Sequence, residues 1–325
     1  MKHVLSSLAC LVVAVLIIAC QGKTDPVGVF QPSENTPVEE TPAVQPLPVF
    51  PDQVLVGAGD IAQNNQPGTA AKTAELVKWV LRSFFGSTAF TLGDNNNNHP
   101  FENLLTTLFR DTWGQDEIKK DLYATIGNHE LDHDEDASIF YNLFGERGGA
   151  GNDGNYSRDV GAWLEVHLNS NNVTAGSIEW LEQELKENPD KHVLAMFHHP
   201  LFSSGLHGGN MQVRYIWEKM LEHGRAQRAK GTKKCLVVFN GHQHSYERFA
   251  PQNLDGEYDV NGIIQFTVGT GGAKLMPFIA QRLNSMARGV AHGVLKAVLG
   301  NDRMEYEFIP IPGSNFRDSG TIMCG

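Results

Sequence analysis

The chain reads CLVVFNGHQH from residue 235 to residue 244, and this stretch decides its fold class. A short apolar run leads into a glycine turn that carries two histidines. Because the run does not alternate apolar with polar residues, it is typical of a strand covered on both faces. A glycine turn after such a strand points its polar side chains out of the carboxyl edge of the sheet, where open α/β folds place their sites.

Four other apolar runs end in the same way. The turns are Gly59-Asp60 after VLVGA, Gly93-Asp94 after AFTL, Gly127-Asn128-His129-Glu130 after LYATI, and His198-His199-Pro200 after VLAMF. One such turn alone is weak evidence for a metal site, since Asp and Asn are common wherever a chain reverses. Five strand ends that carry only oxygen and nitrogen ligands indicate a site for two metal ions.

The rest of the pattern predicts alternating strands and helices, and therefore a layered α/β fold. Ser177 is predicted to cap the second helix, with acidic residues in its first turn. The acidic residues 132–136 are interpreted as a solvated helix start. We expect strands at Gln53–Ala58, 89–92, 122–126, 193–197, 236–239 and 263–268, antiparallel pieces at 162–169 and 293–309, and helices at 69–83, 178–187 and 213–229.

Composition narrows the class of protein. Hydrophobic residues make up 41% of the chain and charged residues 19%, as in ordinary globular proteins. The formal net charge of −11 leaves no basic footprint, so the sequence argues against a nucleic-acid partner.

The N-terminus predicts export to the bacterial cell envelope. Residues 1–19 form an apolar signal, and Ile17-Ile18-Ala19-Cys20 resembles a lipobox, which implies a lipid on Cys20 and contact with the bilayer. Cleavage elsewhere, or an uncleaved anchor, stays open. Residues 20–52 are rich in Pro, Glu and Thr and are expected to form a linker, with one domain at 53–325. Of the remaining cysteines, Cys235 and Cys324 either form a disulfide or stay separate, with Cys235 in the core.

The joint motif set resembles the calcineurin-like metallophosphoesterases, most closely the branch of the purple acid phosphatases and their bacterial relatives. The stretches FHHPLFSSGLHG, NGHQHSYERFAP, VGTGG and FRDSGTIMCG carry the likeness, which runs from about Val54 to the C-terminus. The resemblance implies a single catalytic domain, a sandwich of two mixed β-sheets flanked by helices. It also implies a centre of two divalent or trivalent ions (Fe, Zn or Mn).

The resemblance also assigns roles. Asp94 is expected to bridge the two metals, Asp60 and His244 to hold one, and Asn128, His198 and His242 to hold the other. His129 is expected to protonate the leaving group. Asn128, His199 and His207 are candidates to bind substrate, and His207 is also a candidate acid.

The sequence departs from the family at two positions. Purple acid phosphatases have a metal-binding Tyr three residues after the bridging Asp, where this chain has Asn97. Other members have a His two residues after the first Asp, where this chain has Ala62. Asn97 is therefore a candidate ligand through its amide oxygen, with His99 as a weaker alternative.

The function expected from these residues is hydrolysis of phosphomonoesters by a metal-bridging hydroxide. A phosphodiesterase is the alternative within enzymes. A surface lipoprotein that only binds metal or phosphate is the alternative outside them. The sequence does not fix the substrate, because loops such as 95–103, 145–156 and 203–211 shape the entrance.

Overall fold

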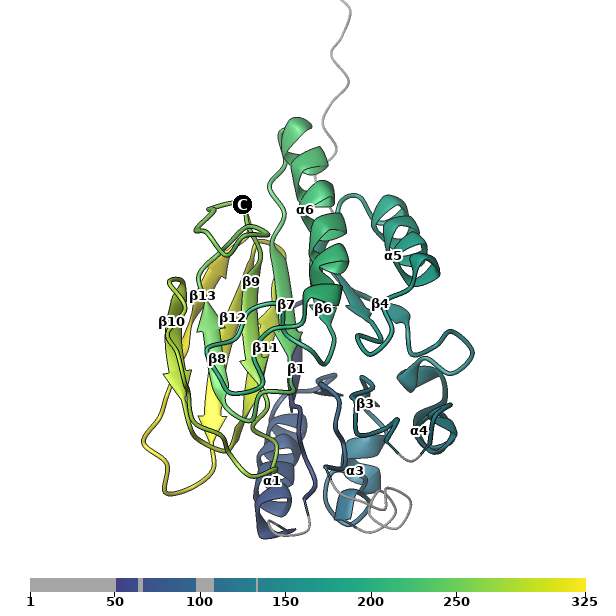
Figure 1. The fold of residues 1–325 in the computed structure, drawn as a ribbon, viewed down its shortest axis with the longest axis vertical. Coiled ribbons are helices and arrows are strands. Elements are labelled where there is room, and N and C mark those ends of the chain that lie inside the picture. Colours follow the sequence, from purple (N-terminus) through teal and green to yellow (C-terminus); the bar gives the residue numbers. More distant parts are fainter. Residues whose placement is uncertain (1–50, 64–66, 98–107, 133) are drawn as a thin grey trace, which may run out of the picture. The chain divides into compact units, whose positions relative to one another are not determined.

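A computed structural model of the protein describes residues 51–63, 67–97, 108–132 and 134–325. The predicted signal, Cys20, most of the predicted linker and His99 lie outside these residues. Within them, two β-sheets face each other and helices cover their outer faces (Figure 1). This is the two-sheet α/β sandwich expected from the sequence. Among the described residues, no helix is both long and apolar enough to cross a bilayer.

The first sheet has six strands in the order β13-β12-β11-β1-β2-β3. Strands β1, β2 and β3 run parallel, while β11, β12 and β13 pair antiparallel. Because parallel neighbours end at one edge, the turns after β1, β2 and β3 lie side by side. The strands are β1 (Gln53–Ala58), β2 (Thr88–Thr91), β3 (Leu122–Tyr123), β11 (Gly293–Leu299), β12 (Arg303–Pro310) and β13 (Ser319–Met323).

The second sheet has seven strands in the order β10-β8-β9-β7-β6-β5-β4. Strands β5, β6, β7 and β9 run parallel, and β4, β8 and β10 are antiparallel to their neighbours. The strands are β4 (Tyr156–Val160), β5 (Trp163–His167), β6 (His192–Met196), β7 (Leu236–Asn240), β8 (Tyr246–Phe249), β9 (Ile264–Val268) and β10 (Ser285–Gly289).

The helices cover the strands that the sequence marks as apolar throughout. Helices α5 and α6 lie over the second sheet, and α1 packs against the first (Figure 1). In β7, Val237 and Phe239 pack between the sheets while Leu236 and Val238 pack under the helices. Both faces are therefore buried, which explains the missing alternation. The helices are α1 (Pro67–Ser83), α3 (Asp116–Lys119), α4 (Ser138–Phe144), α5 (Ala175–Glu187) and α6 (Arg214–Ala229), with short 3-10 turns η2 (Gly145–Gly148) and η3 (Met211–Val213).

Two local predictions were wrong. The N-cap of α5 is Thr174, whose hydroxyl accepts from the Ser177 backbone N–H, while Ser177 sits one turn inside and completes the capping box. The first turn of α5 contains no acidic residue. Strand β3 ends at Tyr123, earlier than predicted; the next backbone N–H, of Ala124, bonds to Arg147, and the Thr125 N–H still reaches Thr91 at the end of β2.

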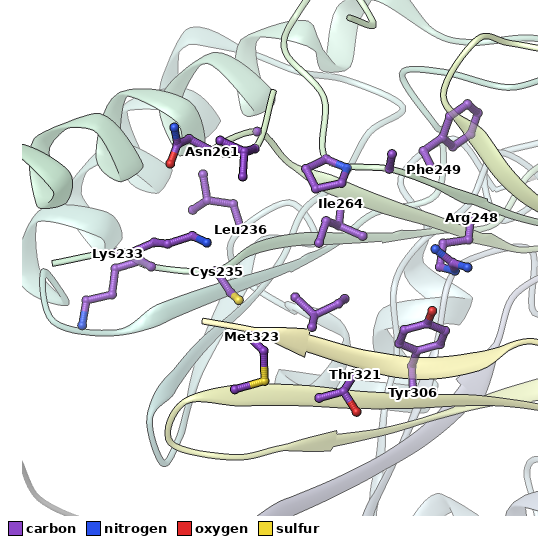
Figure 2. A pocket seen from close by; sticks show the side chains of 16 residues that line it. Lys233, Cys235, Leu236, Arg248, Phe249, Asn261, Ile264, Tyr306, Thr321 and Met323 are labelled. Atoms are coloured by element: carbon purple, nitrogen blue, oxygen red, sulfur yellow. The ribbon is translucent and has the colours of Figure 1, made fainter. Parts of the chain in front are cut away.

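Cys235 and Cys324 form a disulfide, which resolves the alternative that the sequence left open. The bond joins the start of β7 in the second sheet to the residue after β13 in the first. Beside it lies a pocket of about 290 Å³, whose wall includes Tyr306 and Arg248 (Figure 2). The Arg248 guanidinium lies 5.0 Å from the centre of the Tyr306 ring and is paired with Asp318. No Asp, Glu or His among the described residues lines this pocket, in contrast to the site described below.

Removing this disulfide is expected to destabilise the domain. The bond closes a loop with a sequence separation of 89 residues, so its loss restores much chain entropy to the unfolded state. The double variant Cys235→Ser/Cys324→Ser should lose about 3–5 kcal/mol of unfolding free energy in urea titrations. The expectation is contradicted if the double variant unfolds at the same urea concentration as the wild type. It is also contradicted if a dithiol reductant leaves the unfolding midpoint of the wild type unchanged.

Candidate metal centre

Five strand ends from the two sheets meet at one place. The backbone N–H of Gly59, after β1, donates to Val268 at the end of β9 (2.9 Å). The N–H of Gly241, after β7, donates to the carbonyl of His198 after β6 (3.0 Å). The first bond joins the two sheets at the turn after β1, and the second joins the turns after β6 and β7 within the second sheet. The turns after β2 and β3 adjoin the turn after β1 within the first sheet.

The backbone at this meeting point is strained. Among the described residues other than glycine, five have positive φ angles, and three of these are Asp60 (+57°), Asp94 (+51°) and His242 (+67°). Non-glycine residues rarely adopt this conformation, and it clusters at functional sites. Gly127 shows how close the backbones are, because a Cβ there would lie 2.2 Å from Asp94 Oδ1. The fold therefore holds three predicted ligands in an unfavourable backbone conformation, with their side chains directed into the site.

Asp60 and His244 form one half of the site. His244 donates through Nδ1 to the carbonyl of Lys274 (2.9 Å), so its Nε2 faces Asp60 Oδ1 at 3.2 Å. Asp60 is fully buried, and neither of its carboxylate oxygens accepts a hydrogen bond within the described part of the chain. Burial disfavours a charge on His244, but Asp60 outweighs it and raises the histidine pKa.

His198 is the centre of the other half. Its Nδ1 donates to the carbonyl of Leu92 (2.7 Å), which leaves Nε2 to face the site. That nitrogen lies 3.1 Å from Asn128 Oδ1, 3.2 Å from His242 Nδ1 and 3.3 Å from Asp94 Oδ2. Burial opposes a charge on His198, yet Asp94 raises its pKa to about 9. Burial and the nearby His198 lower the pKa of His242 to about 2.

Asn97 lies in the turn that follows β2, beside Asp94 and Ala62. Its backbone N–H donates to Ala62 (2.7 Å) and its side-chain N–H donates to the Asp94 carbonyl (3.0 Å). Its amide oxygen is buried and accepts nothing within the described residues. The two positions at which the sequence departs from the family, Ala62 and Asn97, are thus neighbours in space.

His129 lies at the edge of the site, and both its backbone and its ring make contacts that position it. Its backbone N–H donates to Asp94 Oδ1 (2.9 Å), and its ring Nε2 lies 3.7 Å from Asp94 Oδ2. The other ring nitrogen, Nδ1, contacts Asp132 Oδ2 at 2.6 Å. Asp132 was predicted to lie in a solvated helix start, and its contact with His129 was not predicted. Only the three-residue spacing from His129 hinted at it.

Glu130 is a second residue that sequence reasoning missed. Its buried carboxylate accepts backbone N–H groups from Gly127 (2.6 Å), Asn95 (2.8 Å) and Asp94 (3.0 Å). It therefore ties the end of β2 to the end of β3 directly behind the site. Burial and the Asp94 charge raise the Glu130 pKa to about 7.

His199 and His207 complete a group of histidines. The ring of His199 lies 4.4 Å from that of His242, and its Nδ1 contacts Ser170 Oγ at 2.9 Å. Burial, with His198 nearby, lowers the His199 pKa to about 3. His207 is exposed, and its ring lies 4.7 Å from that of His242. Its backbone N–H donates to the buried Gln243 (3.0 Å), so the GHQH turn also positions the His207 loop.

The residues present fit metal ions. Ligand atoms of Asp60, Asp94 and His198 lie within 4.8 Å of one another, as do those of His198, His199 and His242. Carboxylate and amide oxygens and imidazole nitrogens converge there, while Asp60 lacks hydrogen-bond donors. Buried acceptors that face each other are unfavourable unless a cation lies between them. Each of His198 and His244 donates its other ring N–H to a backbone carbonyl, the second-sphere contact that metal-bound histidines usually make.

The chain is similar to known phosphoesterases in sequence and in fold. The family model for calcineurin-like phosphoesterase matches residues 54–246. A comparison with curated proteins finds no match. A purple acid phosphatase from seeds of yellow lupin (Lupinus luteus) superimposes with a TM-score of 0.67 at 19% identity, over 84% of this chain and 54% of that one. GAP50, the anchor in the inner membrane complex of Plasmodium, superimposes with a TM-score of 0.60 at 12% identity, over 83% of this chain and 89% of that one. PhoD superimposes with a TM-score of 0.54 at 9% identity, over 86% of this chain and 71% of that one.

Proposed function

The chain belongs to the calcineurin-like phosphoesterase family, and from that premise we propose that it is a metal-dependent phosphatase that hydrolyses phosphomonoesters. One observation carries the proposal: buried ligand atoms from five strand ends converge beside His129. The sandwich fold alone does not decide function, since it is shared with a phosphatase and with a protein named as an anchor. The site residues favour catalysis, because His129 and Asp132 serve no purpose in merely holding ions.

Seven residues are proposed to hold two ions. Asp94 would be a ligand shared by both ions, while Asp60, His244 and Asn97 would hold one of them. Asn128, His198 and His242 would hold the other. When bound, the ions supply a nucleophilic hydroxide near neutral pH and neutralise charge on the phosphoryl oxygens. The buried, unpartnered oxygens of Asp60 and Asn97 support this assignment.

The remaining residues act on the substrate. Asp132 contacts Nδ1 of His129 and so orients the ring with Nε2 toward Asp94, where a proton on Nε2 can pass to the departing oxygen. His199 and His207, which flank His242, offer ring N–H groups to the phosphoryl oxygens. A phosphomonoester dianion has three terminal oxygens for these donors, and this favours monoesters over diesters.

The assay that tests the proposal compares two substrates with the same leaving group. We expect 4-nitrophenyl phosphate to be hydrolysed with a kcat/KM at least about tenfold above that for bis(4-nitrophenyl) phosphate, with Fe, Zn or Mn supplied. A reversed preference identifies a phosphodiesterase. Stoichiometric metal binding without hydrolysis of either compound identifies a binding protein.

We also propose that the enzyme is exported and anchored to the bacterial cell envelope by a lipid on Cys20. The support is the sequence of residues 1–20, an apolar segment that ends in Ile17-Ile18-Ala19-Cys20. A chain with Cys20→Ser that is still acylated and still membrane-bound contradicts this proposal.

A further inference from the structure

Large apolar side chains are exposed together in one segment of the second sheet. Ile279 is 65% exposed, Leu283 91%, Met286 62% and Val290 53%. A third of the large apolar side chains exposed among the described residues fall between 279 and 290. Single exposed apolar residues are ordinary, but a concentration of them marks an interaction site. The segment includes β10, which lies at the edge of its sheet (Figure 1).

The same segment is basic in an acidic protein. No Asp or Glu occurs between Asp259 and Asp302, although the chain carries a net charge of −11. Arg282 is exposed, and its Nε donates to the carbonyl of Ser203 (3.3 Å). Arg288 is half-buried, and its Nη1 donates to the carbonyl of Ala280 (3.0 Å). Neither arginine forms an ion pair within the described ranges. The apolar–basic surface is defined here as Ile279, Arg282, Leu283, Met286, Arg288 and Val290.

One acidic residue lies beneath this surface. Glu247 is fully buried and accepts from the Ser204 backbone N–H (2.8 Å) and from the Ser285 hydroxyl (2.6 Å). Its carboxylate is therefore engaged inside the domain and does not lie on the exposed face. The six residues that define the surface carry a net positive charge, from Arg282 and Arg288.

The apolar–basic surface is attached to the rim of the metal centre. Backbone N–H groups of Ile279 and Ala280 donate to the Ser204 carbonyl (3.0 and 3.1 Å), in the loop that leads to His207. Three residues before the segment, the Met276 N–H donates to the carbonyl of His244 (2.9 Å). Whatever binds the surface is therefore brought to the entrance of the site.

We propose that the apolar–basic surface docks the domain onto an anionic lipid bilayer. Transfer of exposed Leu, Ile and Met side chains into the interfacial region of a bilayer lowers the free energy. Arginines beside them are attracted to anionic headgroups, while their stems stay in apolar surroundings. Because the chain as a whole carries a net charge of −11, a surface that presents arginines without carboxylates of its own favours docking in this orientation. The inference concerns where the enzyme works and does not depend on which phosphoester it hydrolyses.

Vesicle sedimentation tests the proposal with the full chain carrying Cys20→Ser, so that no lipid on Cys20 contributes. We expect this parent to bind vesicles with 30% phosphatidylserine at least tenfold more tightly than vesicles of phosphatidylcholine alone. Adding Ile279→Ser/Leu283→Ser should weaken binding about tenfold or more. Adding Arg282→Gln should weaken it about fivefold, and only on the anionic vesicles.

Trp79→Ser/Phe85→Ser is the matched control, because both residues are exposed but belong to α1 and the turn after it, on the other sheet. These changes should leave vesicle binding unchanged. All variants should hydrolyse a soluble aryl phosphate like the parent, which shows that they are folded. The proposal is overturned if the parent does not prefer anionic vesicles or if the Ile279/Leu283 variant binds like the parent. It is also overturned if light scattering shows a dimer of the parent that this variant dissociates.

Discussion

Replacing Asp60 by Asn is expected to remove one metal ion and to lower kcat/KM by about 10³-fold. The loss follows because a charged carboxylate becomes a neutral amide, which leaves the shared Asp94 as the one proposed carboxylate ligand of the ion beside His244. Several kcal/mol of charge stabilisation then disappear, and about 1.4 kcal/mol corresponds to a factor of ten in rate. Metal content after dialysis, measured by mass spectrometry, and hydrolysis of an aryl phosphate check the two effects.

The same variant should make the metal-free protein no less stable. Asp60 is fully buried and has His244 Nε2 beside it at 3.2 Å, with no well-aligned hydrogen bond among the described residues, and a buried polar group left poorly bonded costs about 1–3 kcal/mol. Asn tolerates the left-handed conformation at this position, and its amide N–H can donate to His244 Nε2. Thermal unfolding in a chelator should therefore show an unchanged or raised midpoint. Loss of metal together with loss of apo stability points to misfolding instead.

Asp153→Asn is the matched control for Asp60→Asn. Asp153 also has a positive φ (+49°), but it is exposed in the loop before β4, away from the predicted ligands. The substitution makes the same chemical change in the same backbone conformation. Metal content should equal that of the wild type. An Asp60→Asn protein that keeps two ions refutes the ligand assignment.

Replacing His129 by Ala is expected to lower kcat by about 10²–10⁴-fold for alkyl phosphates. The loss should be far smaller for 4-nitrophenyl phosphate, whose leaving group departs without a proton. Rates measured along a series of leaving groups should therefore depend more steeply on leaving-group pKa than in the wild type. A uniform loss across the series shows that His129 positions the substrate and donates no proton.

Asp132→Ala tests how His129 is held. It removes the acceptor at Nδ1 and should reproduce part of the His129→Ala effect, with the same leaving-group dependence. Asp134→Ala is its control, because Asp134 accepts from the Ile139 N–H (2.7 Å) at the start of α4. That change should cost about 1 kcal/mol of stability and leave the leaving-group dependence as in the wild type. Equal behaviour of the two variants contradicts a role for Asp132 in catalysis.

The sequence predicted the central strands and helices well for a physical reason. Strands β1, β6 and β7 are buried on both faces, so their apolar runs are unambiguous, and glycine turns mark their ends. Prediction was poorer where local signals compete. Thr174 and Ser177 are both good capping residues, and only the packing of α5 decides which one starts the helix. Strands β4, β8, β10 and β13 were not predicted, because their residues are polar or partly exposed.

The sequence by itself determined the chemistry of the candidate site: which strand ends carry carboxylate, amide and imidazole groups, and in what order. Only the tertiary structure decided that these groups lie about 3 Å apart, that Cys235 bonds Cys324, and that Asp132 and Glu130 support the site. Ligand types are properties of single residues and can be recognised in a motif. Their convergence depends on the order of strands in two sheets, which is set by long-range packing between segments as distant in the chain as Asp60 and His244.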